Sequence, residues 1–71
     1  MRSLFAKEIT TLAKENKDIV LLSGDIGNRM FDDFKDITSN RFFNCGIAEA
    51  NMMSVAAGMA LCGLRPVIYT I

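Results

Sequence analysis

The chain has no histidine, no tryptophan, one proline and two cysteines in its 71 residues. Without histidine, and with Cys45 and Cys62 at no spacing that suits a metal site, we expect no metal ligands here. Both cysteines have apolar neighbours in the sequence, and we interpret them as reduced core residues of a cytoplasmic protein. Eight basic side chains balance eight acidic ones, and no basic cluster is present. Nucleic acid is therefore not an expected partner.

No segment is typical of a secreted or a membrane protein. Residues 1–10 are too polar for the apolar part of a secretory signal. Residues 47–64 approach the length of a membrane span, but glutamate, asparagine, serine, glycines and many alanines interrupt the run. We expect a protein core there, and so a cytoplasmic protein with no membrane partner.

The chain is short for its hydrophobic content. Seventy-one residues make one small domain at most, with a marginal core. Yet 51% of the residues are hydrophobic, and three strand-like segments would each need cover on both faces. The sequence also stops at Ile71 within an apolar run, without a turn signal. We therefore expect residues 1–71 to be one partial domain, with no second domain.

Hydrophobic spacing predicts three helices that alternate with three strands. The expected elements are a helix with Ser3 as its N-cap, a strand at residues 19–22, a helix at 30–37, a strand at 42–45, a helix from Gly46 to about Cys62 that ends at Gly63, and a strand at 67–71. The order α-β-α-β-α-β predicts an α/β fold with a parallel sheet. Ligands collect at the carboxyl ends of such strands, here residues 23–28 and 44–49.

Two motifs stand on either side of a segment rich in small residues. Residues 41–51 read RFFNCGIAEAN, and residues 63–70 read GLRPVIYT. This pattern resembles the pyrimidine-binding domain of the transketolase family, with its RFFNxGIAEQN and GxRPxxYT motifs. Ala50 departs from the familiar glutamine. The resemblance implies the N-terminal part of a three-layer thiamine-diphosphate-binding fold, in an enzyme that transfers a two-carbon ketol unit between sugars.

The resemblance also implies a cofactor and partners. The cofactor is thiamine diphosphate, and its Mg²⁺ is held by a diphosphate-binding domain or subunit that this chain does not include. Met1 falls at the start of the pyrimidine-binding domain, as in family members divided into two chains, where this half is the C-terminal section. We therefore expect a dimeric transferase that acts on sugar phosphates and is inactive as this segment alone.

Glu49 is the expected catalytic residue. It enters a helix that is apolar on nearly every face, so we expect burial, and a buried carboxyl group needs a partner or holds its proton. The matching glutamate of the family bonds the aminopyrimidine ring and shares a proton that promotes its imino form, which takes the thiazolium C2 proton. The alternative is an N3 glutamate that accepts from the backbone N–H of an N-cap Gly46.

Asp25 is the second candidate for the cofactor site. The string Ser23-Gly24-Asp25-Ile26 resembles a family element near the cofactor and the subunit contact, although aspartate after a strand is also an ordinary turn residue. Gly24-Asp25 and Asn51 imitate the Gly-Asp-Gly triplet and distal asparagine that hold Mg²⁺. However, Ile26 replaces the second glycine and Asn51 falls inside a helix, so we predict no metal ligand.

Two arginines concern the substrate. Arg2 aligns with a family arginine that binds a sugar phosphate, although a charged residue near a terminus is commonly just solvated. Arg29 stands where many transketolases have a serine that touches the substrate phosphate. That departure weakens the expected phosphate-sugar specificity, although a guanidinium can itself bind phosphate.

Other classes of protein remain open. A non-catalytic α/β dimerisation or interaction module would need neither Glu49 nor thiamine. A flavodoxin-like or Rossmann-type nucleotide binder is disfavoured because no strand is followed by GxGxxG. Within the family, Asn51 favours transketolase over deoxyxylulose-phosphate synthases, which commonly carry histidine there; a nucleotide-sugar-pathway relative is the third option.

Overall fold

The computed structural model describes residues 2–25 and 28–71. Its elements, in chain order, are α1 (Arg2–Glu15), β1 (Ile19–Ser23), the 3-10 helix η1 (Asn28–Phe31), α2 (Asp32–Thr38), the 3-10 helix η2 (Ser39–Arg41), β2 (Phe42–Asn44), α3 (Glu49–Leu61) and β3 (Arg65–Tyr69). The predicted alternation of helices and strands is confirmed. No helix in the described part of the chain is long and apolar enough to cross a membrane.

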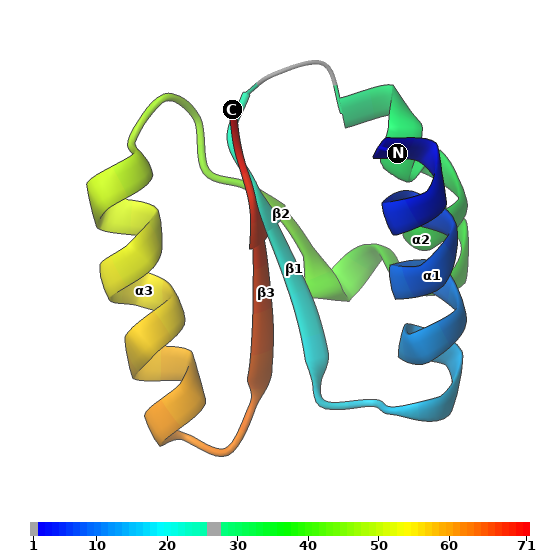
Figure 1. Ribbon diagram of the computed structural model, residues 1–71. Coiled ribbons are helices and arrows are strands. Elements are labelled where there is room, and N and C mark those ends of the chain that lie inside the picture. Colours follow the sequence, from blue (N-terminus) through cyan, green and yellow to red (C-terminus); the bar gives the residue numbers. More distant parts are fainter. Residues whose placement is uncertain (1, 26–27) are drawn as a thin grey trace.

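The three strands form a parallel sheet in the order β2-β1-β3 (Figure 1). The central strand β1 pairs with β3 along its whole length, from Ile19 opposite Arg65 to Ser23 opposite Tyr69. One face of the sheet is covered by α3 and the other by α1 and α2 (Figure 1). The predicted α/β class with a parallel sheet in three layers is therefore confirmed.

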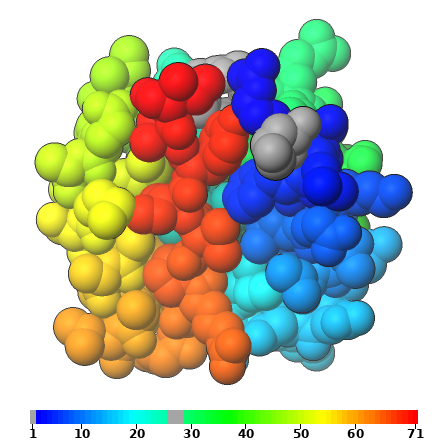
Figure 2. Space-filling model, in the orientation of Figure 1, coloured from blue at the N-terminus to red at the C-terminus, as the bar shows by residue number. Residues whose placement is uncertain are grey.

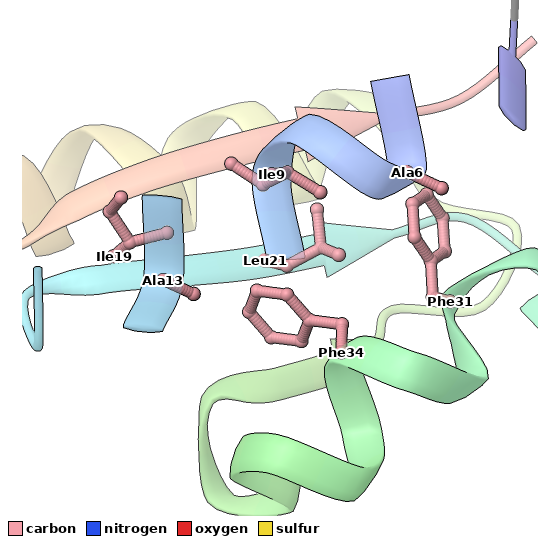
Figure 3. Close-up of a cluster of buried hydrophobic side chains, with 7 residues drawn as sticks. All are labelled: Ala6, Ile9, Ala13, Ile19, Leu21, Phe31 and Phe34. Atoms are coloured by element: carbon pink, nitrogen blue, oxygen red, sulfur yellow. The ribbon is translucent and has the colours of Figure 1, made fainter. Parts of the chain in front are cut away.

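All five residues of β1 are buried, and their side chains alternate between two cores. Val20 and Leu22 form the smaller core with Met52 of α3. The larger core lies between the sheet and the layer of α1, η1 and α2 (Figure 3), and its buried members are Ala6, Ile9, Ala13, Ile19, Leu21, Phe31 and Phe34. The layer of α1, η1 and α2 thus contributes more buried side chains to the core than α3 does.

Aromatic rings join β3 to the larger core. The ring centroid of the fully buried Phe31 lies 5.4 Å from that of Tyr69 and 6.1 Å from that of Phe5, both at interplanar angles of 81°. Phe5 in turn stacks on Tyr69 at 5.4 Å and 17°. Edge-to-face and stacked pairs at these distances are favourable contacts. They hold one face of β3 against the start of α1.

α3 is buried along one stripe only. Met52 and Ala56 are buried and Met59 is partly buried, at the spacing of a single helix face. Large apolar side chains elsewhere on α3 and in its flanking loops are exposed: Ile47, Met53, Val55, Leu61 and Leu64. The expectation of a helix buried on nearly every face is wrong for this chain, because no described element covers its outer side.

The two ends of α3 compare differently with the sequence prediction. The helix begins at Glu49 instead of Gly46, and Ala48 is its N-cap, without a side-chain capping bond. At the other end Gly63 has φ +95°, and its N–H donates to the carbonyl of Ala60 at 3.1 Å. This is the left-handed glycine that commonly ends a helix. The predicted helix end is confirmed. The observed start, Glu49, lies three residues after the predicted start at Gly46.

Several smaller expectations need correction. Ser3 lies inside α1, which begins at Arg2, so it is not the N-cap. Cys45 packs partly buried against the smaller core, but Cys62 is exposed and is no core residue of this chain. The last strand begins at Arg65 and not at residue 67 because pairing with β1 starts there. Of the predicted loop over residues 23–28, positions 26 and 27 lie outside the described residues.

Arg41 joins the end of α1 to the start of β1. Its Nη1 donates to the carbonyls of Asn16 at 3.0 Å and Ile19 at 3.1 Å, and its Nη2 donates to the carbonyl of Ala13 at 3.1 Å. Its Nε donates to Oγ1 of Thr38 at 2.8 Å. Carbonyls at a helix end lack partners within the helix, and a cation there also complements the helix dipole. Arg41 therefore has a structural role: it stabilises the connection between α1 and β1.

Replacing Arg41 with methionine should lower the free energy of unfolding by about 3 kcal/mol, because hydrogen bonds from a charged donor are lost and carbonyls lose their partners. Arg65→Met is the matched control, since the Arg65 side chain is exposed, and a surface change of this kind costs about 0.5 kcal/mol or less. The measurement is urea denaturation of the protein as its gene encodes it. Equal losses for the two variants would contradict the role given to Arg41.

Candidate active site

The chain segments that follow β1 and β2 are bonded to each other beyond the paired strands. The N–H of Cys45 donates to the carbonyl of Ser23 at 2.8 Å, and the N–H of Asp25 donates to the carbonyl of Gly46 at 3.1 Å. In a regular parallel ladder the second acceptor would be the carbonyl of Cys45. Gly46 has φ +71°, a conformation that glycine adopts readily, and this turn brings its own carbonyl to Asp25.

Side chains connect the same two segments. Oδ1 of Asn44 accepts from the N–H of Gly46 at 2.9 Å, and Nδ2 of Asn44 donates to Oδ1 of Asp25 at 3.2 Å. Asp25 was expected from the sequence, whereas Asn44 was not singled out as a site residue. The signal that could have found Asn44 is an asparagine directly after a strand and two residues before a glycine, the spacing of an Asx turn.

Glu49 is the first residue of α3 and is exposed. Within residues 2–25 and 28–71 its carboxylate takes part in no hydrogen bond or ion pair. The alternative role as an N3 residue that caps Gly46 is wrong, because Glu49 is at N1 and the Gly46 N–H is bonded to Asn44. The carboxylate therefore lies open at the start of the helix, where negative charge is favoured.

Arg2 and Arg29 are both exposed. α1 begins near the edge at which the strands end, on the face of the sheet opposite α3 (Figure 1). In the described part of the chain neither arginine forms an ion pair with Asp25 or Glu49. The structure thus brings Asp25 to the loop that leads into Glu49. Within the described residues Arg2 forms no ion pair with either carboxylate.

A groove of about 360 Å³ lies away from these residues. It runs between α1 and α2 and is lined by Lys7, Thr10, Thr11, Lys14, Asp33, Asp36 and Ile37. Its lining mixes both signs of charge and includes neither Asp25 nor Glu49. Asn51 lies inside α3, as the sequence predicts. Among the described residues no three His, Cys, Asp or Glu side chains gather where they could hold a metal ion.

A three-layer parallel α/β domain with an open carboxylate at the carboxyl edge of its sheet is a ligand-binding architecture. The whole chain, residues 1–71, matches the family model of the transketolase pyrimidine binding domain. The chain therefore belongs to this family, as its motifs at residues 41–51 and 63–70 predict.

Relatives of known sequence are much longer than this chain. Over 71 residues it is 35% identical to an uncharacterized 33.6 kDa protein in the fasciation locus of Rhodococcoides fascians, covering all of this chain and 23% of that protein. It is 38% identical over 66 residues to the 1-deoxy-D-xylulose-5-phosphate synthase of Gloeobacter violaceus, covering 92% of this chain and 10% of the synthase. The synthase of Corynebacterium diphtheriae is 39% identical over 67 residues, with 93% and 11% covered.

The chain thus spans about a quarter or less of the length of these relatives. Because synthases are among them, Asn51 does not by itself assign the chain to the transketolases. What these comparisons establish is the family.

The conformation at Gly46 yields a direct test. A Cβ at this position would meet nothing within 4 Å, so any cost comes from the positive φ and not from crowding. Gly46→Ala should lower the free energy of unfolding by about 1–2 kcal/mol, and Gly46→Asn by clearly less, because asparagine tolerates the left-handed region. Denaturant unfolding of both variants measures the difference. If Gly46→Ala and Gly46→Asn had the same free energy of unfolding, the left-handed conformation at residue 46 would not contribute to stability.

Proposed function

We propose that residues 1–71 bind the aminopyrimidine of thiamine diphosphate, in a transketolase-like enzyme that transfers a two-carbon ketol unit between sugars. The observation that supports this most is the placement of Glu49 in a chain of this family: an exposed carboxylate, without a partner in the described residues, at the ligand edge of the sheet. Such a carboxylate adds only about 0.3–1 kcal/mol through the helix dipole. A chemical role accounts for it better than a structural one.

The side chains at this edge fit an aminopyrimidine ring. A carboxyl group donates or accepts a proton at a ring nitrogen, and Glu49 has both carboxyl oxygens free in the described chain. Asp25, held by Asn44, provides a second acceptor on the neighbouring segment. When bound, thiamine diphosphate supplies the stabilised carbanion that transfer of a ketol unit requires. Glu49 then holds and passes the proton at the ring nitrogen, with Asp25 as support.

This role requires Glu49 to lose most of its contact with water. Covering a carboxyl group from water disfavours its charged form, which is the condition for sharing a proton with a ring nitrogen. The described chain leaves Glu49 exposed, so the cover must come from the cofactor and from a partner. We propose that the partner is the diphosphate-binding domain or subunit, which also holds Mg²⁺, and that the assembly is a dimer.

The surface of the chain supports such a partner. Two residues before Glu49 the side chain of Ile47 is 84% exposed, and on α3 that of Met53 is 57% exposed. Figure 2 shows β3 lying uncovered on the surface between α3 and α1. Extended apolar surface of this kind marks an interface. The length of the relatives, four or more times the matched segment, agrees with further domains.

The substrate is proposed as a sugar phosphate. The synthases similar to this chain are named for 1-deoxy-D-xylulose 5-phosphate, which is itself a sugar phosphate. Arg2, exposed at the start of α1, offers a guanidinium for the phosphate, and Arg29 in η1 offers another. The cytoplasmic location remains a prediction.

A second candidate is a non-catalytic interaction module, and the exposed apolar side of α3 favours it. Such a module would bind a partner through α3 without thiamine diphosphate. The two functions differ in what they require of Glu49.

Glu49→Gln and Glu49→Ala should each lower kcat about 10²–10⁴-fold, because the proton at the ring nitrogen can no longer be passed. The free energy of unfolding should change by about 1 kcal/mol or less, since the side chain is exposed. Glu8→Gln, exposed on α1, is the control and should keep full activity. The measurement is steady-state turnover of the protein as its gene encodes it, with its partner and saturating thiamine diphosphate. Near wild-type turnover in a folded Glu49→Ala protein would remove the catalytic assignment and favour the interaction module.

The proposed interface has its own test. Met53→Glu should weaken assembly with the diphosphate-binding partner, and with it thiamine diphosphate binding, at least about tenfold, because burying an unpaired charge is costly. Leu12→Glu is the matched control: Leu12 is 49% exposed, but it lies on α1, across the sheet from α3. Sedimentation equilibrium and cofactor titration measure the two effects. Equal behaviour of the two variants would contradict a partner on the outer side of α3.

A further inference from the structure

The amide of Asn44 bonds to two chain segments at once. Its Oδ1 accepts from the N–H of Gly46 at 2.9 Å, three residues before Glu49. Its Nδ2 donates to Oδ1 of Asp25, 19 residues earlier in the sequence, at 3.2 Å. A backbone bond from the Asp25 N–H to the Gly46 carbonyl at 3.1 Å runs beside it. Asn44, Asp25 and Gly46 thus form a closed set of three bonds, which we call the Asn44 clamp.

We infer that Asn44 is a positioning residue that fixes Asp25 relative to Glu49. The inference rests on the proposed function, because it concerns the two carboxylates assigned to the aminopyrimidine. Asp25 follows β1 and Glu49 begins α3, so the distance between them depends on how the segments that leave the paired strands β1 and β2 are held together. In the clamp, the side chain of Asn44 holds the two segments together by donating directly to the Asp25 carboxylate.

A purely local role does not account for the amide. The Asx turn needs only the acceptor Oδ1, which aspartate would provide as well as asparagine. The donor Nδ2 serves Asp25 alone among the described residues. Asparagine at residue 44 is therefore explained by the need to donate to a carboxylate on the other segment, since a second carboxylate there would repel Asp25.

The test exchanges the two side chains. Asn44→Asp keeps the acceptor for Gly46 but removes the donor, so two carboxylates face each other. Asp25→Asn keeps an oxygen that accepts from Asn44. The double variant Asp25→Asn/Asn44→Asp restores one donor and one acceptor in reversed order. The three variants and the wild type are compared in the protein as its gene encodes it, with its partner.

Two readouts are measured, one of them independent of activity. The first is the Kd of thiamine diphosphate, which should rise about tenfold or more in Asn44→Asp, the effect expected from one lost charge-assisted bond. In the double variant it should return to the value of Asp25→Asn alone. The second is hydrogen exchange of the Asp25 amide without ligand, which should speed up in Asn44→Asp and slow again in the double variant.

The outcomes separate the clamp from the proposed function. Cofactor binding by the wild type, without recovery in the double variant by either readout, overturns the clamp. Recovery of amide protection in a protein that never binds thiamine diphosphate overturns the proposed function and leaves Asn44 with a structural role only. If Asn44→Asp fails to fold, a double variant that folds and binds the cofactor supports the clamp, and one that does not fold overturns it.

Discussion

The burial of β1 on both faces is the constraint on which the rest of the structure depends. A strand with five buried residues must have its backbone groups bonded on both sides, which β2 and β3 provide. Its alternating side chains also require two apolar layers, one from α1 and α2 and one from α3. Arg41 secures the start of this strand by bonding carbonyls of Ile19 and of the end of α1.

The same arrangement creates the site. Because the strands are parallel, they end at one edge, and the segments that leave β1 and β2 meet there. Gly46 turns its carbonyl toward Asp25, Asn44 bonds to both segments, and Glu49 follows at the start of α3. The carboxylates proposed for the cofactor are therefore placed by backbone geometry and by one amide.

The composition of α3 and its burial give different information. Its side chains are apolar on nearly every face, yet only the stripe of Met52 and Ala56 is buried. Sequence pattern reports the environment that a helix is built for, whereas the structure reports the neighbours it has in this chain. The apolar side chains of α3 that stay exposed form the surface that we assign to a partner. Glu49 is exposed for the same reason, because no described element covers that side of the helix.

The sequence by itself determined the order of helices and strands, the parallel sheet, the end of α3 at Gly63 and the family. Each of these follows from local pattern: apolar spacing, a glycine free to take positive φ, or a contiguous motif. It misplaced the start of α3, because no local rule distinguishes Gly46 as an N-cap from Gly46 as a turn residue.

Only the tertiary structure decided the roles of Arg41 and Asn44 and the open position of Glu49. Arg41 bonds to residues 22 to 28 positions away, and Asn44 to Asp25 across 19 positions. No periodicity marks such pairs, since their geometry exists only after the sheet has brought separate segments to one edge. Burial likewise depends on which elements lie opposite a face, which is a property of the assembled fold and not of the residue itself.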